Sequence, residues 1–191
     1  MNPNDIEIEI KLPLKNPEEV IAFLQKKAKL LAKNTHQKDI YYTPKHRDFL
    51  ATKYPYEWLR LRHSSKGNCI TYKHYYPENT KVTDYCDEFE SSLDNISVLE
   101  KILTSLDFKT LAVVDKNRST WDYKQVEVAI DEVKDLGSFI ELEAKRQFPT
   151  PQAAKEYLYE ILEELHAQVG KEELRGYPYL LLAKKGYQFG E

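Results

Sequence analysis

The sequence has few of the features that mark secreted, membrane-spanning or cysteine-rich metal-binding proteins. Only two cysteines occur, Cys69 and Cys86, and their spacing fits neither a metal-ligand pattern nor a redox pair. We therefore expect two reduced thiols in a cytosolic protein. No apolar run approaches the roughly 18 residues that a transmembrane helix needs, and no basic stretch followed by an apolar one opens the chain. These absences predict a soluble, cytoplasmic protein with no membrane partner.

The sequence also has few glycines and little net charge. The chain has six glycines, and Gly67 and Gly137 stand isolated, so the phosphate-loop pattern G-x-x-x-x-G-K-[ST] does not occur. The 31 acidic and 28 basic residues give a net charge of only −3. This balance disfavours a nucleic-acid partner held by the overall field of the protein. The information therefore lies in how the charges are grouped.

The length of 191 residues suits a single domain over 1–191. Periodicity and capping residues predict three helices, from the N-cap Asn16 to about Lys33, from Ser97 to Leu106, and from Thr150 to a stop at Gly170. Between them, alternating segments predict strands at 5–12, 38–43, 57–63, 69–76, 84–91, 110–115, 118–122, 125–133 and 138–147. Short connections favour antiparallel pairing, including a hairpin around Lys134-Asp135-Leu136-Gly137.

The opening strand carries the first chemical signal. Ile6, Ile8 and Ile10 alternate with three charged residues, Glu7, Glu9 and Lys11. Alternate side chains of a strand share a face and lie about 7 Å apart. Two carboxylates held this way can share a divalent cation, and the lysine can meet the anion that the cation carries.

Similar charged rows recur along the chain, each mostly of one sign. They are Arg60 and Arg62, Glu88 and Glu90, Lys116 and Arg118, Glu127 and Asp131, and Glu141 and Glu143, with Lys73 following Thr71. One interpretation is an ordinary antiparallel sheet with one solvated face. The other is a closed or nearly closed barrel whose ionic face points inward and whose apolar face is covered by the helices. Rows of like charge need opposing rows or ions, which favours the inward-facing arrangement.

A cavity lined by both acids and bases suits a metal-bound polyphosphate. Mg²⁺ or Mn²⁺ takes oxygen ligands and is often held by a few carboxylates together with substrate phosphates. Arginine and lysine provide several donors to phosphate oxygens. Phosphoryl or nucleotidyl transfer can then proceed by positioning and charge neutralisation, without a covalent nucleophile.

These rows resemble the motifs of the CYTH superfamily, the triphosphate tunnel metalloenzymes, in order along nearly the whole chain. The matching segments are Glu7-Ile8-Glu9-Ile10-Lys11, His36 to Tyr42, Leu59-Arg60-Leu61-Arg62, Thr71-Tyr72-Lys73, Glu88-Phe89-Glu90, Lys116-Asn117-Arg118, and Asp131 through Gly137 to Glu143. Within the superfamily, Lys38-Asp39-Ile40-Tyr41 and Glu173-Leu174-Arg175-Gly176-Tyr177 are most similar to class IV adenylyl cyclases, although that class often has serine where Gly176 stands.

The resemblance implies an α+β fold, with a closed eight-stranded antiparallel β-barrel that forms a tunnel and has flanking helices. It also implies site roles. The metal ligands would be Glu7, Glu9, Asp131, Glu141 and Glu143. The substrate-binding residues would be Lys11, Arg60, Arg62, Lys73, Glu88, Glu90, Lys116 and Arg118, with Lys11, Arg60 and Lys73 also catalytic. His36 is either catalytic or a polar residue at a strand entry, and Lys184 or Lys185 is either a late basic contact or part of a solvated tail.

The implied activity is that of a Mg²⁺- or Mn²⁺-dependent enzyme on a small-molecule triphosphate. The first candidate is a class IV adenylyl cyclase, which converts ATP to cyclic AMP and pyrophosphate. Inorganic or thiamine triphosphatases share most of the motifs, and a non-catalytic polyphosphate- or nucleotide-binding module is a third alternative. A homodimer through an exposed strand or helix face is compatible with the sequence, but no residue specifies one.

Overall fold

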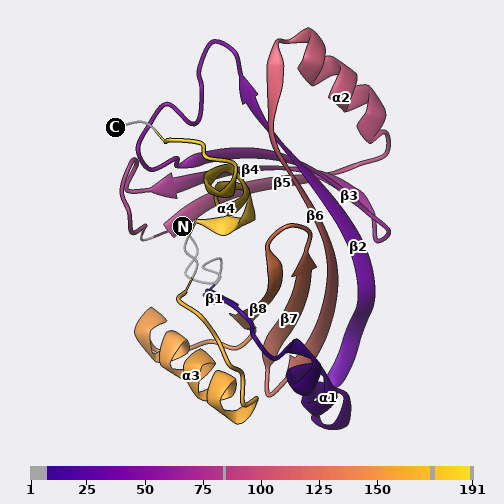
Figure 1. Cartoon of the computed structure of the whole chain (residues 1–191), viewed down its shortest axis with the longest axis vertical. Helices are drawn as coiled ribbons and strands as arrows, with labels where there is room; N and C mark the ends of the chain where they lie inside the picture. Colours follow the sequence, from indigo (N-terminus) through magenta and orange to yellow (C-terminus); the bar gives the residue numbers. More distant parts are fainter. Residues whose placement is uncertain (1–7, 84, 173–174, 190–191) are drawn as a thin grey trace. The chain divides into compact units, whose positions relative to one another are not determined.

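The computed structural model describes residues 8–83, 85–172 and 175–189. Its strands form one eight-stranded sheet in the order β1-β8-β7-β6-β2-β3-β4-β5 (Figure 1). The strands are β1 (Glu9–Pro13), β2 (Lys29–Pro44), β3 (Glu57–Ser64), β4 (Asn68–Tyr76), β5 (Tyr85–Leu93), β6 (Phe108–Tyr123), β7 (Val126–Val133) and β8 (Gly137–Ala144). The helices are α1 (Pro17–Lys27), α2 (Ile96–Ser105), α3 (Pro151–Glu164) and α4 (Gly176–Lys184). This arrangement confirms the predicted α+β class with an eight-stranded antiparallel sheet and flanking helices.

The chain divides into two compact units. Unit 1 comprises Met1–Thr35 and Lys116–Leu174, and unit 2 comprises His36–Asp115 and Arg175–Glu191. The long strands β2 and β6 contribute residues to both units. The proposal that 1–191 form a single domain stays a prediction. Among the described residues, none of the helices has the length and apolar character needed to span a membrane.

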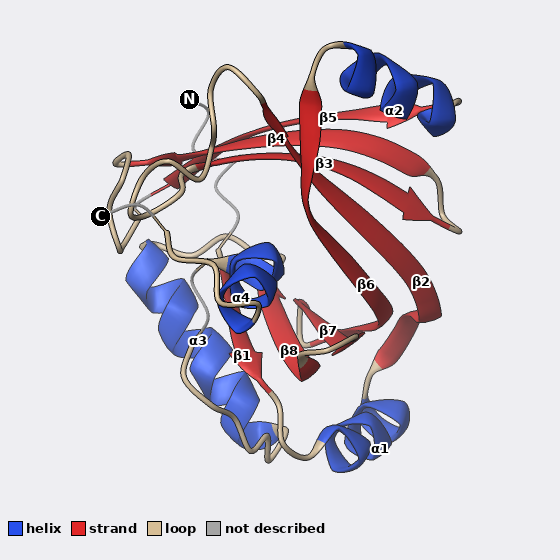
Figure 2. Cartoon of the chain, turned by 45° about the horizontal axis from the view of Figure 1, so that its top comes forward, coloured by secondary structure: helices blue, strands red, loops and turns tan. Residues whose placement is uncertain are grey.

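Unit 1 has a core on one face of its strands. Ile10, Ile140 and Leu142 are almost completely buried and pack with Leu24 of α1 and Leu158 of α3. Helix α3 contacts both β1 and β8, and it lies beside β1 in Figure 2. Because successive side chains of a strand point to opposite faces, this packing sends the alternate residues of the same strands to the other face. That other face carries the charged rows.

Unit 2 follows the same rule. Leu61 and Ile70 pack against Ile96 and Leu103 of α2 on one face of the sheet. The alternate positions, which include Arg60 and the fully buried Thr71, therefore belong to the opposite face.

Three predictions of element bounds are wrong. The third helix, predicted to stop at Gly170, ends at Glu164, and the chain beyond it turns so that Val169 pairs with Leu14 in an isolated bridge. The first helix ends at Lys27, and the chain continues as β2 from Lys29, although Leu30 and Leu31 fit a helical pattern. In β2 these two leucines are 49% and 45% exposed, so pairing in the sheet, and not burial of an apolar helix face, determines the conformation here. The predicted strands 110–115 and 118–122 are one continuous strand, β6.

Helix α4 was not predicted, because its sequence GYPYLLLAK lacks amphipathic spacing. It begins at Gly176, where φ is +78°, and it buries Tyr177, Leu181 and Leu182. The two predicted N-caps differ in outcome. Thr150 caps α3 by accepting a hydrogen bond from the Ala153 amide, whereas the Asn16 side chain makes no capping bond to α1.

The predicted hairpin at 134–137 is confirmed. The Leu136 amide donates to the Val133 carbonyl at 3.1 Å, and β8 begins at Gly137. Glycine suits this position because φ is +95° there. The hairpin sets the register in which Asp131 lies opposite Phe139 and Ala129 lies opposite Glu141.

The core of unit 1 gives a stability prediction. We expect Ile140→Ala, at a position that is 0% exposed, to lower the free energy of unfolding by about 2–5 kcal/mol in urea denaturation. The matched control is Ile102→Ala on α2, where the side chain is 47% exposed and the expected change is within about 0.5 kcal/mol. Equal losses in the two variants would contradict the assignment of the core face.

Candidate functional site

The polar face of unit 1 brings acids and bases together across neighbouring strands. Glu9 of β1 lies opposite Glu143 of β8, and Lys11 lies opposite Glu141. Arg118 of β6 lies opposite Asp131 of β7. Opposite charges therefore meet across the sheet at Lys11 with Glu141 and at Arg118 with Asp131, whereas Glu9 lies opposite a second acid. We call this set, with Lys116, the unit 1 cluster.

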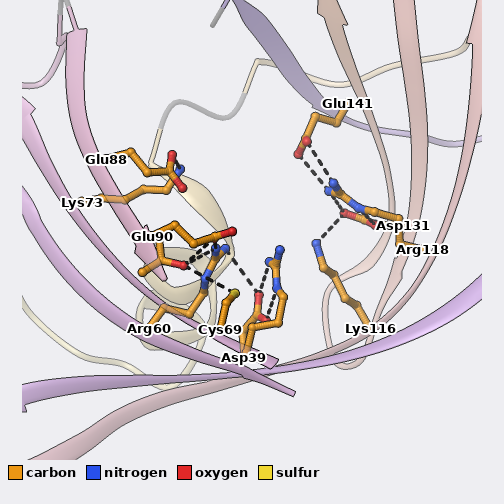
Figure 3. A network of polar contacts seen from close by, with 12 residues as sticks. Asp39, Arg60, Cys69, Lys73, Glu88, Glu90, Lys116, Arg118, Asp131 and Glu141 are labelled. Carbon is orange, nitrogen blue, oxygen red and sulfur yellow. Dashed lines mark hydrogen bonds and ion pairs between the residues drawn. The ribbon is translucent and has the colours of Figure 1, made fainter. Parts of the chain in front are cut away.

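Asp131 is the most buried member of the unit 1 cluster, with 1% of its surface exposed. Arg118 binds it in a two-point arrangement, with Nε donating to Oδ1 and Nη2 donating to Oδ2, both at 2.7 Å. Lys116 Nζ donates to Oδ2 at 3.1 Å. Burial would raise the pKa of Asp131, but the charge of Lys116 and the bonds from Arg118 outweigh burial and lower the pKa to about 2. Figure 3 shows Asp131 between these two bases.

Glu141 links Arg118 to Lys11. Its Oε1 accepts from Arg118 Nη1 at 3.2 Å and its Oε2 accepts from Nη2 at 3.1 Å, and Lys11 Nζ lies 2.8 Å from the same Oε2 atom. Burial opposes ionisation, but the charges of Lys11 and Arg118 hold the pKa of Glu141 well below its usual range. In turn, Glu141 and Glu9 raise the pKa of Lys11 above its ordinary value despite burial. Glu141 and Lys11 are therefore both charged near neutral pH.

Glu9 and Glu143 form the more open edge of the unit 1 cluster. The Glu9 side chain is 46% exposed, with the Lys11 ammonium 4.0 Å away. Glu143 is paired with Lys145 at 2.6 Å, and Lys145 also lies 3.9 Å from Glu127. Lys145 was not predicted, although its spacing from Glu143 places it on the same face of the alternating pattern. The predicted ligand Glu7 lies outside the described residues.

The oxygen donors at this edge suit a hard divalent cation. Within residues 8–83, 85–172 and 175–189, no group of three or more His, Cys, Asp or Glu side chains is arranged to hold a metal ion. Glu9 and Glu143 nevertheless face each other in register, and Mg²⁺ is commonly bound by one or two carboxylates that leave its other positions to substrate oxygens. The donor set therefore fits a metal that arrives with a phosphate ligand.

Unit 2 carries a second group of charged residues, the unit 2 cluster. Its central contact is a two-point ion pair between Arg62 of β3 and Asp39 of β2. Nε donates to Oδ1 and Nη2 donates to Oδ2, both at 2.7 Å. Arg60 Nη1 lies 3.9 Å from Asp39 Oδ2. Asp39 is 2% exposed, and it lies within the matching segment His36 to Tyr42 without being one of the predicted site residues. No local pattern indicated this contact, because only the register of β2 and β3 places Asp39 opposite Arg62.

Arg60 is also tied to β4 and β5. Its Nη2 donates to the Thr71 hydroxyl at 2.8 Å, and that hydroxyl donates to Glu90 Oε2 at 2.9 Å. Burial would raise the pKa of Glu90, but the bonds from Thr71 and Cys69 and the charge of Arg60 lower it. Figure 3 shows Arg60, Cys69 and Glu90 side by side.

Lys73 and Glu88 complete the unit 2 cluster. They lie opposite each other on β4 and β5, and the Lys73 ammonium is 2.6 Å from Glu88 Oε2. Cys86 shares this face, and burial raises the pKa of its thiol to about 11, so the thiol is protonated near neutral pH. Both cysteines are free thiols.

The remaining candidates lie elsewhere. His36 Nε2 is 2.7 Å from Asp115 Oδ1 in a solvent-exposed pair. His36 has the opposite strand parity to Asp39, so it belongs to the other face of β2. Lys184 is the last residue of α4, and Lys185 follows it; both are exposed.

Comparisons with known proteins identify a family and several relatives of similar fold. The CYTH domain family matches residues 5–177. A protein of Methanocaldococcus jannaschii named "Putative adenylate cyclase MJ0240" is 32% identical over 138 residues, which is 72% of this chain and 76% of that protein. The structure of the PH1819 protein from Pyrococcus horikoshii OT3 superposes with a TM-score of 0.73 at 30% identity, covering 93% of this chain and 99% of that one.

A third similar protein comes from Hippeastrum. It is described as a "putative adenylyl cyclase" with a dominant triphosphatase activity, and it superposes with a TM-score of 0.63. The alignment covers 95% of this chain and 96% of that one, but at 19% identity it supports the fold alone.

The pKa of Asp131 predicts how stability depends on pH. The pKa falls from 3.8 to about 2 on folding, so the ion pairs stabilise the protein above pH 4 and are lost as the pH drops towards 2. We expect Asp131 to contribute about 2 kcal/mol to this loss in the free energy of unfolding. Urea denaturation between pH 5 and pH 2 measures it. Asp131→Asn should show a shallower decline than the wild type, and an equal decline would contradict the assignment.

Proposed function

Because the chain belongs to the CYTH domain family, we propose that it is a divalent-metal-dependent enzyme that acts on a triphosphate, of the class IV adenylyl cyclase type. The observation that carries this proposal is the charged face of each unit. In both units, arginines and lysines on alternate strand positions are held by carboxylates from neighbouring strands. Such fixed donors are what a polyanionic substrate needs. We also propose a single cytoplasmic domain.

The relative from Methanocaldococcus jannaschii supports the cyclase type, since its name carries that activity and it is 32% identical to this chain. Under this proposal the substrate is ATP, the ribose 3′-hydroxyl attacks the α-phosphorus, and the bond to the bridging oxygen breaks. Cyclic AMP forms and pyrophosphate leaves with that oxygen. The hydroxyl proton passes to solvent or to a carboxylate.

The bases would bind the phosphate oxygens. In unit 1 these are Lys11, Lys116 and Arg118, and in unit 2 they are Arg60, Arg62 and Lys73. Guanidinium groups can bind two phosphate oxygens at once, whereas lysine acts as a point charge. Lys11, Arg60 and Lys73 are also the proposed catalytic residues, because charge that develops on the leaving phosphate needs donors already in place.

The acids would serve two purposes. Glu9 and Glu143, together with Glu7, would hold Mg²⁺ or Mn²⁺, which when bound supplies charge neutralisation at the phosphate oxygens and lowers the pKa of a hydroxyl. Asp131 and Glu141 belong to the same proposed metal-binding side, and in the structure they also accept bonds from Arg118. Glu88 and Glu90 would orient Lys73 and Arg60 towards substrate.

A triphosphatase uses the same residue types. Water, and not a ribose hydroxyl, would attack the terminal phosphorus of tripolyphosphate or thiamine triphosphate, and the remaining diphosphate would leave. The two reactions differ in which phosphorus lies in line with the nucleophile. The charged faces alone favour neither reaction, so the two are distinguished by identifying the reaction products.

The first experiment separates the products of ATP with Mg²⁺ or Mn²⁺. We expect cyclic AMP and pyrophosphate. ADP with phosphate, or rapid hydrolysis of tripolyphosphate or thiamine triphosphate, would instead establish a triphosphatase. Tight binding of triphosphate in calorimetry without any product would show a binding module.

A second experiment tests the metal-binding side. We expect Glu9→Gln to lower metal-dependent turnover by at least about a hundredfold, because one charged oxygen ligand is lost. Glu164→Gln is the matched control, since this carboxylate on α3 is 43% exposed, close to the 46% of Glu9, and is paired with Lys124. Full activity of Glu9→Gln would refute the role of Glu9.

A further inference from the structure

Asp39 is a buried carboxylate outside the proposed metal-binding and phosphate-binding sets. It lies on β2 with 2% of its surface exposed, directly opposite Arg62, while Tyr41 lies opposite Arg60. Arg60 and Arg62 are two residues apart on β3 and so share its face. Asp39 is therefore the carboxylate that both proposed phosphate-binding arginines of unit 2 approach.

The contact with Arg62 is the stronger one. Two parallel N–H···O bonds of 2.7 Å join Nε and Nη2 to the two carboxylate oxygens. This two-point geometry fixes the plane of the guanidinium as well as its position. An anion that Arg62 binds therefore meets a guanidinium whose plane is already set by Asp39.

The contact with Arg60 is looser. Its Nη1 is 3.9 Å from Asp39 Oδ2, which is an ion-pair distance but too long for a hydrogen bond. Its Nη2 donates to the buried Thr71 hydroxyl at 2.8 Å and, over a longer distance of 3.4 Å, to Glu90 Oε2. Its Nε is buried and, within the described residues, has no hydrogen-bond partner. Arg60 is thus held by one short hydrogen bond, whereas two short bonds hold Arg62 to Asp39.

The negative charge of Asp39 also acts on the two neighbouring guanidinium groups. Two guanidinium groups on one strand face repel, and Asp39 offsets one of the two charges. Removing the carboxylate charge would leave the attraction for a polyanion intact or larger, while the plane of Arg62 would no longer be held. Loss of Asp39 should therefore affect the geometry of bound substrate more than the strength of binding.

We propose that Asp39 is a positioning residue that gives the pair Arg60 and Arg62 unequal roles, with Arg62 as a fixed donor and Arg60 as the donor that exchanges partners when phosphate binds. This inference rests on the proposed function, since it concerns the same triphosphate. It predicts that Asp39 acts on turnover through Arg62, without touching the substrate itself.

The test compares Asp39→Asn with the wild type, using whichever of ATP and inorganic tripolyphosphate the wild type turns over faster. We expect kcat to fall at least about tenfold, because small misplacements of catalytic donors are costly, while KM changes less than about threefold. The matched control is Glu57→Gln. Glu57 is also a buried carboxylate, 5% exposed and bound by Arg47 and Tyr72, but on the opposite face of β3. We expect Glu57→Gln to leave both kcat and KM unchanged.

A double variant separates positioning from a general loss of stability. Arg62→Lys keeps the charge but cannot form the two-point contact, so we expect a kcat loss of similar size. The kcat of the double variant, with both Asp39→Asn and Arg62→Lys, should be less than about threefold below that of Arg62→Lys alone, because both changes break the same contact. Should Asp39→Asn alone fail to fold, Arg62→Lys still tests the proposal, and an unchanged kcat for it would overturn the role of a fixed Arg62.

The outcomes keep the two proposals apart. A wild-type protein that turns over no triphosphate contradicts the proposed function and this inference with it. An active wild type together with an Asp39→Asn variant of equal kcat, or one in which only KM rises, overturns the positioning role and leaves the proposed function standing. Equal kcat losses in Asp39→Asn and Glu57→Gln would also overturn it.

Discussion

The pairing of buried carboxylates with bases from neighbouring strands is the constraint on which the charged face of this sheet depends. Asp131 and Asp39 are 1% and 2% exposed, and each accepts a two-point contact from an arginine on the adjacent strand. An ionised carboxylate buried without such partners would cost several kcal/mol, so breaking either contact should be far more disruptive than breaking a surface ion pair. Charge pairing thus binds β6 to β7 and β2 to β3.

The same alternation links stability to the proposed chemistry. Each strand that contributes a charged residue to one face contributes an apolar residue to the other, as Glu141 and Leu142 do on β8. Leu142 packs in the core of unit 1, so the core holds the backbone that positions Glu141. Arg118 and Lys11, which contact Glu141, are thereby held in place before a polyanion binds. Charged groups that need little reorganisation on binding are the physical basis of electrostatic catalysis. Asp39 extends the principle, since it positions a base and not the substrate.

Much of the fold and of the site could be predicted from local patterns. Strand alternation placed Arg60, Arg62, Glu141 and Asp131 on charged faces, and glycine at 137 predicted a tight hairpin that the structure contains. The errors lie where long-range contacts override local preference. Leu30 and Leu31 belong to β2 because that segment pairs in the sheet, and α4 forms where Leu181 and Leu182 are buried, although its sequence lacks helical periodicity.

The sequence by itself determined which face of a strand each residue occupies, because side chains alternate with a period of two whatever the strand pairs with. Only the tertiary structure decided which acid meets which base. Which residues lie opposite each other depends on strand order and register. These place Asp39 opposite Arg62 and Glu143 opposite Glu9, although the members of each pair are far apart in the sequence. Hence the composition of the charged faces could be predicted, whereas the specific contacts of Asp39, Thr71 and Lys145 could not.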